Sequence, residues 1–213
     1  MAFDSDNRFL YLASSGGHSV TRWSVSVGDG HVMSFYAKEV VFTSKAHGTT
    51  PTIIDLKIQA AALFVATSDE KILRIDEDAL LTSNEKAPLV QVLYKDLGRL
   101  RSLAAAGTYL LWATSKEVML GTVDGPAPLV AERPVLNQKS LEDLVGSSSE
   151  VVQVELLWDA SCFFLAAWDV TKETLSIFQA LCHVTRACEK RRFAQPQLHS
   201  RSQRQCREQS RGR

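Results

Sequence analysis

Leu63-Phe64-Val65-Ala66-Thr67-Ser68 is one of four stretches in which an apolar run contains an alanine near its end. The other three stretches span residues 10–15, 110–115 and 163–168. The separations between their alanines are 53, 47 and 53 residues, and the alanines are Ala13, Ala66, Ala113 and Ala166. A period of about 50 residues indicates an internal repeat, which decides the fold before any local motif is interpreted.

Each of the four stretches is followed by a polar turn and a second apolar segment. These second segments cover residues 19–25, 71–76, 117–123 and 173–178. The first turn, Ser15-Gly16-Gly17-His18, has the glycine and serine typical of tight hairpin turns. The connections are too short for a crossover helix, so each pair predicts an antiparallel hairpin. The nearly continuous apolar first arm predicts a strand that is buried on both faces.

Two further strands can be placed around the hairpins. The upstream candidates are residues 53–58, 100–105 and 151–157, and the downstream candidates are 33–43, 89–94 and 129–131. No strand is evident before the first hairpin. A repeated four-stranded meander of this length is typical of a β-propeller. We therefore predict an all-β, propeller-like fold of about four antiparallel four-stranded blades in an incomplete ring. Short helical segments are expected at residues 77–81 and 140–145.

The net charge of zero is the sum of two unlike regions. Residues 183–213 carry nine basic residues against Glu189 and Glu208, a net +7, and residues 1–182 carry 15 basic and 22 acidic residues, a net −7. The basic region has few large apolar residues and no helical or strand period, so it cannot offset its ordering entropy by burial. We predict two parts: a propeller-like repeat domain over 1–182 and a disordered basic tail over 183–213.

The tail supplies the candidate binding residues. They are the basic side chains Arg186, Lys190, Arg191, Arg192, Arg201, Arg204 and Arg207. Such a run is most often a solvated tail, but it also suits nucleic acid or an acidic partner. A third interpretation is that the tail is foreign to the fold, such as the product of a misread exon end.

The first hairpin resembles a known family of repeats. Residues 10–23, Leu-Tyr-Leu-Ala-Ser-Ser-Gly-Gly-His-Ser-Val-Thr-Arg-Trp, are similar to the strand-turn-strand of the NHL, LDL-receptor class B (YWTD) and SMP-30-type six-bladed propellers. Residues 111–125 are similar to the YWTD pattern. The resemblance implies a propeller that serves as a protein-interaction platform or, in the SMP-30 type, a metal-dependent lactonase. The family's acidic residue after the small one is replaced here by Ser14, Thr67, Thr114 and Ala167.

Catalytic and metal-binding patterns are weak in this sequence. Cys182, His183 and Cys188 form the only Cys/His cluster, and their spacing does not match a zinc site. The innermost strands offer Asp55 and Glu155 as carboxylates, with Asp55 expected on the solvent side or, alternatively, facing a channel. We predict no catalytic residue, no metal site and no cofactor. Cys162 is expected in the core, as are Trp112 and Trp168, with an aromatic rim for a peptide as the alternative for the tryptophans.

Three functions remain open from the sequence. The first is a non-catalytic protein-interaction module or scaffold, because repeat folds often serve as platforms. The second is a hydrolase of the lactonase or strictosidine-synthase-like type. The third is nucleic-acid association through the tail. Neither a signal peptide nor an apolar run long enough for a membrane helix is evident, so we expect an intracellular, cytoplasmic location without membrane insertion.

Overall fold

The computed structural model describes most of the repeat region. The described residues are 1–4, 8–28, 33–44, 51–59, 61–76, 90–126, 133–145, 149–156 and 162–181. The predicted tail, the boundary at 182/183 and the predicted helix at 77–81 lie outside these ranges, so they stay predictions.

The described chain forms four antiparallel sheets in which strands that follow one another in the sequence lie side by side. Sheet 1 contains β1 (Ala2–Asp4), β2 (Phe9–Ala13), β3 (Ser19–Val27) and β4 (Met33–Thr43). Sheet 2 contains β5 (Ile53–Gln59), β6 (Ala62–Thr67), β7 (Lys71–Asp76) and β8 (Val90–Tyr94). Sheet 3 contains β9 (Leu100–Ala106), β10 (Tyr109–Thr114), β11 (Val118–Thr122) and β12 (Arg133–Leu136). Sheet 4 contains β13 (Ser149–Leu156), β14 (Cys162–Asp169) and β15 (Thr174–Leu181).

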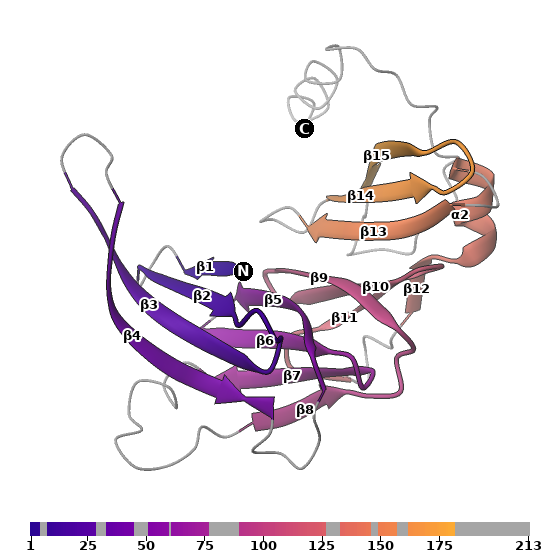
Figure 1. Ribbon diagram of the computed structural model, residues 1–213. Helices are drawn as coiled ribbons and strands as arrows, with labels where there is room; N and C mark the ends of the chain where they lie inside the picture. Colours follow the sequence, from indigo (N-terminus) through magenta and orange to yellow (C-terminus); the bar gives the residue numbers. More distant parts are fainter. Residues whose placement is uncertain are drawn as a thin grey trace, which may run out of the picture.

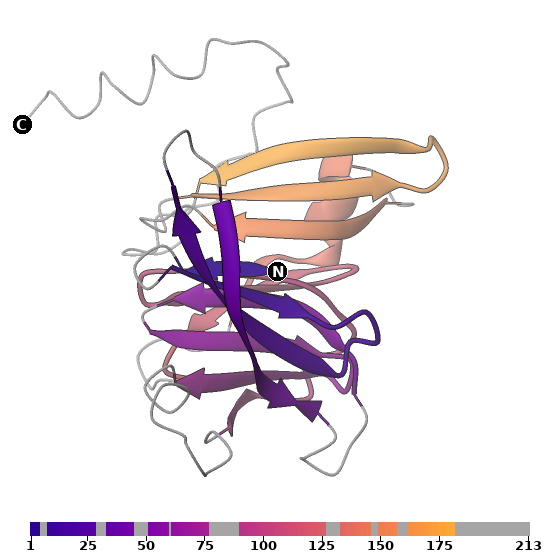
Figure 2. The same ribbon diagram turned by 60° about the vertical axis from the view of Figure 1, so that its left-hand side comes forward.

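The sheets are arranged one after another, as blades are in a propeller, and the fold class predicted from the repeat is confirmed (Figure 1). Neighbouring sheets meet through their first strands, because β5 contacts β1 and β9, and β9 contacts β13. A helix, α2 (Gln138–Val145), connects sheet 3 to sheet 4, and β3 and β4 extend beyond the other strands (Figure 2). No helix of the described residues has the length and apolar character needed to cross a membrane.

Three apolar layers hold the four sheets together, one between each pair of neighbours. The central strands build these layers by alternation, since successive side chains of a strand point to opposite faces. On β6, Leu63 and Val65 pack toward sheet 1, and Phe64 packs toward sheet 3. On β10, Leu110 and Trp112 pack toward sheet 2, and Leu111 packs toward sheet 4. This is why the first arm of each hairpin reads as a continuous apolar run.

One backbone contact recurs between neighbouring sheets. The turn between the second and third strand of a sheet accepts a hydrogen bond from the chain that enters the next sheet. Ile53 N donates to Gly17 O at 2.7 Å, Leu97 N to Glu70 O at 3.2 Å, and Val151 N to Ser115 O at 3.0 Å. The repeat of about 50 residues therefore reproduces both the sheet and its connection.

The hydroxyl side chains that follow two of the shared alanines hold their own turns. The Ser14 hydroxyl accepts from the backbone N–H groups of His18 and Ser19, and the Thr114 hydroxyl accepts from Lys116 and Glu117. In sheet 4 the turn begins two residues later, and Asp169 accepts there from Thr171 and Lys172. Local side-chain bonds of this kind are a normal way to close a turn.

Two strand expectations need correction. Sheet 1 does have a first strand, β1, which the sequence analysis missed because it is only three residues long. The fourth strand of sheet 3 is β12, whereas the segment proposed for it, residues 129–131, lies outside the described residues. The helical segment expected at residues 140–145 is confirmed as the later part of α2.

Candidate interaction surfaces

The outward face of sheet 4 is apolar and exposed. The register places Phe164, Ala166 and Trp168 of β14 on this face, directly opposite Gln179, Ile177 and Leu175 of β15. The other face, with Phe163 and Leu165, packs against sheet 3. We call the exposed surface formed by Phe164, Trp168, Leu175 and Ile177 the tail face, because it lies on the last described sheet. The name does not refer to the basic tail, residues 183–213.

The internal repeat shows how unusual this exposure is. The residue two positions before each shared alanine is Tyr11, Phe64, Leu111 or Phe164, and the exposed fractions are 0%, 1%, 0% and 37%. The residues that pair with the shared alanines are Val20, Ile72, Val118 and Ile177, and their exposed fractions are 0%, 0%, 0% and 67%. The same positions are thus fully buried in sheets 1 to 3 and open in sheet 4.

The outward face of sheet 1 is the opposite end of the stack. Phe3, Leu10, Trp23 and Lys38 form a row across its four strands, because each is the register partner of the next. The Lys38 ammonium lies 5.5 Å from the centre of the Trp23 ring, a cation–π contact. Leu12 lies on the same face, and it pairs with Thr21, which in turn pairs with Val40. Val40 is exposed. We call this surface, with Phe3, Leu10, Leu12, Trp23 and Val40, the head face.

The inner strands carry polar groups that connect the sheets. The Asp55 carboxylate on β5 accepts a hydrogen bond from Leu103 N at 2.8 Å and one from the Ser102 hydroxyl at 3.2 Å. The same hydroxyl accepts from Val154 N at 3.3 Å on β13. Asp55 was expected on the solvent side of an alternating strand, and this was wrong, because the side chain is half-buried and bonded to the next sheet.

Glu155, the second inner-strand carboxylate, is also engaged. Its Oε2 lies 2.5 Å from Lys57 Nζ, so this ion pair joins β13 to β5. A second pair, Arg101 with Glu150 at 3.0 Å, joins β9 to β13. Within the described ranges, no three His, Cys, Asp or Glu side chains gather as metal ligands would. The two carboxylates considered for a lactonase-type site are held in contacts between sheets.

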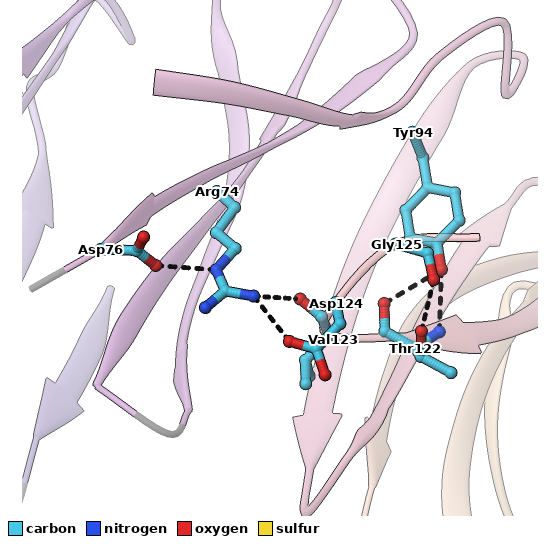
Figure 3. A network of polar contacts seen from close by, with 7 residues as sticks. All are labelled: Arg74, Asp76, Tyr94, Thr122, Val123, Asp124 and Gly125. Carbon is cyan, nitrogen blue, oxygen red and sulfur yellow. Dashed lines mark hydrogen bonds and ion pairs between the residues drawn. The ribbon is translucent and has the colours of Figure 1, made fainter. Parts of the chain in front are cut away.

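A polar network links the outer strands of sheets 2 and 3 (Figure 3). The Arg74 guanidinium bonds Asp76 at 2.8 Å within sheet 2, and Asp124 at 2.8 Å after β11. The hydrogen bond to Asp76 raises the pKa of Arg74 most, burial lowers it, and the hydrogen bond to Asp124 raises it again, so that the pKa lies above its usual value. The Tyr94 hydroxyl accepts from Thr122 N at 2.8 Å and donates to Thr122 O at 3.0 Å. This layer is closed by polar as well as apolar contacts.

Gly121 lies at a close approach between these two sheets. A Cβ added there meets the Tyr94 hydroxyl oxygen at 2.5 Å and a ring carbon of Trp112 at 2.8 Å. Tyr94 and Trp112 are themselves in contact, with ring centroids 4.7 Å apart. Only glycine fits this position without displacing one of the rings.

The predicted site residues lie partly within and partly outside the described residues. Every basic tail residue proposed for binding lies outside the described residues, as do Cys182, His183, Cys188 and Cys206. Cys162 is a buried free thiol, which confirms its assignment to the core. Trp112 is buried as predicted, but Trp168 is exposed on the tail face, so the core assignment was wrong there. The sequence of sheet 4 resembles the sequences of the other sheets, so it does not indicate that Trp168 is exposed. The exposure is evident only from the spatial order of the sheets, in which no described sheet covers this face.

No protein-family model matches the chain, and no curated protein matches it. The NHL, YWTD and SMP-30-type resemblance therefore stays a prediction.

Solved structures show distant likeness. The computationally designed Ika4 protein has a TM-score of 0.46 at 9% identity, over 83% of this chain and 87% of that one. A protein from Lactobacillus plantarum has a TM-score of 0.46 at 12% identity, over 84% of this chain and 55% of that one. AztD from Citrobacter koseri in its apo form has a TM-score of 0.45 at 12% identity, over 83% of this chain and 60% of that one. The chain thus spans little more than half the length of the last two proteins.

Proposed function

We propose that this chain is a non-catalytic protein-interaction module and that the tail face is its docking surface. The observation that carries the proposal is the exposure of Phe164 and Ile177 at positions that are fully buried in the other sheets. A contiguous exposed apolar patch indicates a binding site, because soluble proteins that act as monomers rarely expose a large one. Trp168 adds an aromatic side chain of the kind that dominates binding energy at interfaces.

The proposal is tested by a binding measurement with matched variants. Ile177→Lys places a charge in the tail face, and Thr171→Lys places the same charge in the exposed turn next to it. We expect the full chain and Thr171→Lys to retain a specific protein partner in a pull-down, and Ile177→Lys to lose it. Equal retention by all three proteins contradicts the proposed docking surface.

Nucleic-acid association through residues 183–213 is a second proposal, supported by their net charge of +7. Binding of this kind depends on phosphate neutralisation and weakens as salt rises. We expect salt-sensitive binding of a duplex by the full chain and its loss when residues 183–213 are removed. Binding that is unchanged by this truncation contradicts a role for the tail.

A further inference from the structure

The three apolar layers inside the molecule are one interface used three times. In each layer, the face of a sheet that bears the shared alanine covers the opposite face of the next sheet. Tyr11 of sheet 1, Phe64 of sheet 2 and Leu111 of sheet 3 supply the first half of the three layers. Phe164 occupies the same position in sheet 4, and no described residue covers it to the extent that its equivalents are covered. The tail face is thus one half of a fourth layer.

The head face is the other half of such a layer. The positions equivalent to Leu10 are Leu63, Leu110 and Phe163, and those equivalent to Leu12 are Val65, Trp112 and Leu165. All six equivalents are buried against the preceding sheet. Leu10 and Leu12 are only half-buried, and Phe3 beside Leu10 is exposed. The head face therefore has the residue positions that a tail face normally covers.

We propose that the tail face of one chain packs on the head face of a second copy of the same chain. This inference rests on the proposed function and names its partner. A second copy fits because it supplies the same sheet surface, at the same repeat positions, that completes each of the three internal layers. A single chain carries both halves, on its first and last described sheets, and within one copy the two halves do not cover each other, because Phe3 and Ile177 are exposed.

The two faces of this contact differ, so the interface is heterologous. Heterologous contacts generate closed rings when the rotation between copies closes, and open assemblies when it does not. Both results have the same signature in solution. The mass of the full chain is expected to rise with concentration from the 23.6 kDa of one copy to about twice that value or more.

A pair of complementary variants tests the heterologous contact. Ile177→Lys damages only the tail face, and Phe3→Lys damages only the head face. Each variant of the full chain is expected to have the mass of one copy by sedimentation at concentrations at which the unaltered chain associates. An equimolar mixture still contains one intact tail face and one intact head face, so it is expected to form a two-copy complex. The control Thr171→Lys is expected to associate like the unaltered chain.

Circular dichroism establishes that each variant retains its strands. If Phe3→Lys fails to fold, Val40→Lys replaces it, since Val40 is exposed on the same face. The proposal is overturned if the unaltered chain has the mass of one copy at every concentration, or if the mixture stays at that mass. If the unaltered chain has the mass of one copy but binds a different protein, and Ile177→Lys no longer binds that protein, this inference is overturned and the proposed function stands. A single-copy chain with no such partner overturns both.

Discussion

Sheets 2 and 4 present nearly the same surface to opposite environments. Phe64 and Ile72 of sheet 2 are sealed beneath sheet 3, whereas Phe164 and Ile177, at the equivalent positions of sheet 4, face outward. The repeat sets the type of side chain at each position, and the neighbouring sheet sets its burial. A residue can therefore have the sequence character of a core position and still lie at the surface.

The largest expected effect separates Phe64 from Phe164. Phe64→Ala leaves a cavity in a closed layer and is expected to lower the free energy of unfolding by about 3–5 kcal/mol. Phe164→Ala removes a partly exposed ring and is expected to cost at most about 1 kcal/mol when the chain is dilute. Denaturant unfolding of both variants at low protein concentration measures the difference. Equal losses would show that the tail face is as well covered as the layer between sheets 2 and 3.

A second substitution probes how tightly that closed layer is packed. Gly121→Ala forces a methyl group against Tyr94 and Trp112, and we expect a loss of about 3 kcal/mol, near the upper end for overpacking. The matched control is Gly16→Ala, whose added Cβ meets only a His18 carbon at 3.4 Å. Thermal unfolding compares the two. A Gly121→Ala protein as stable as Gly16→Ala would mean that the sheets separate at little cost.

The polar connection between inner strands is expected to be weaker than the apolar layers. Asp55→Ala removes the acceptor of Leu103 N, and we expect a loss of about 2 kcal/mol because a half-buried donor is left unpaired. Glu155→Ala, which breaks the partly exposed pair with Lys57, is expected to cost at most about 1 kcal/mol. Denaturant unfolding ranks the two variants, and the reverse order would contradict this account of the inner strands.

The smallest expected effect is a dependence of stability on pH. Burial raises the pKa of Asp69 in the β6–β7 turn, but hydrogen bonds from Lys71 and Thr67, together with the charge of Lys71, lower it further, and the pKa lies below its ordinary 3.8. A lowered folded-state pKa stabilises the fold above the unfolded-state value, and this contribution is lost as the pH falls below about 4. Asp69→Asn is therefore expected to reduce the fall in stability between pH 5 and pH 2. An unchanged pH profile would indicate that Lys71 does not stabilise this carboxylate.

Much of the fold could be predicted from the repeat. The spacing of the alanines located all four hairpins, because a buried central strand needs apolar residues on both faces. The short strand β1 was missed because three residues carry no measurable period. The solvent-side position expected for Asp55 was wrong. The alternating pattern of a strand shows which face a side chain is on, but it cannot show that Leu103 N of the next sheet lies beside that face.

The candidate surface was the least predictable feature. The apolar segments that contain Trp168 and Ile177 are similar to segments that are buried in the other sheets, and Trp168 was for that reason predicted in the core. Their exposure depends on the order of the sheets in space, which no local pattern encodes. The exposed faces therefore had to be found by comparing equivalent positions across the repeat.

Hydroxyl-radical footprinting of the full chain over a concentration series tests the central claim most directly. We predict that Phe164 and Ile177 are oxidised in dilute protein and become protected as the concentration rises, whereas Phe64 and Ile72 stay protected throughout. Protection of Phe164 and Ile177 in dilute protein that has the mass of one copy would contradict the claim, because the tail face would then be covered within a single chain.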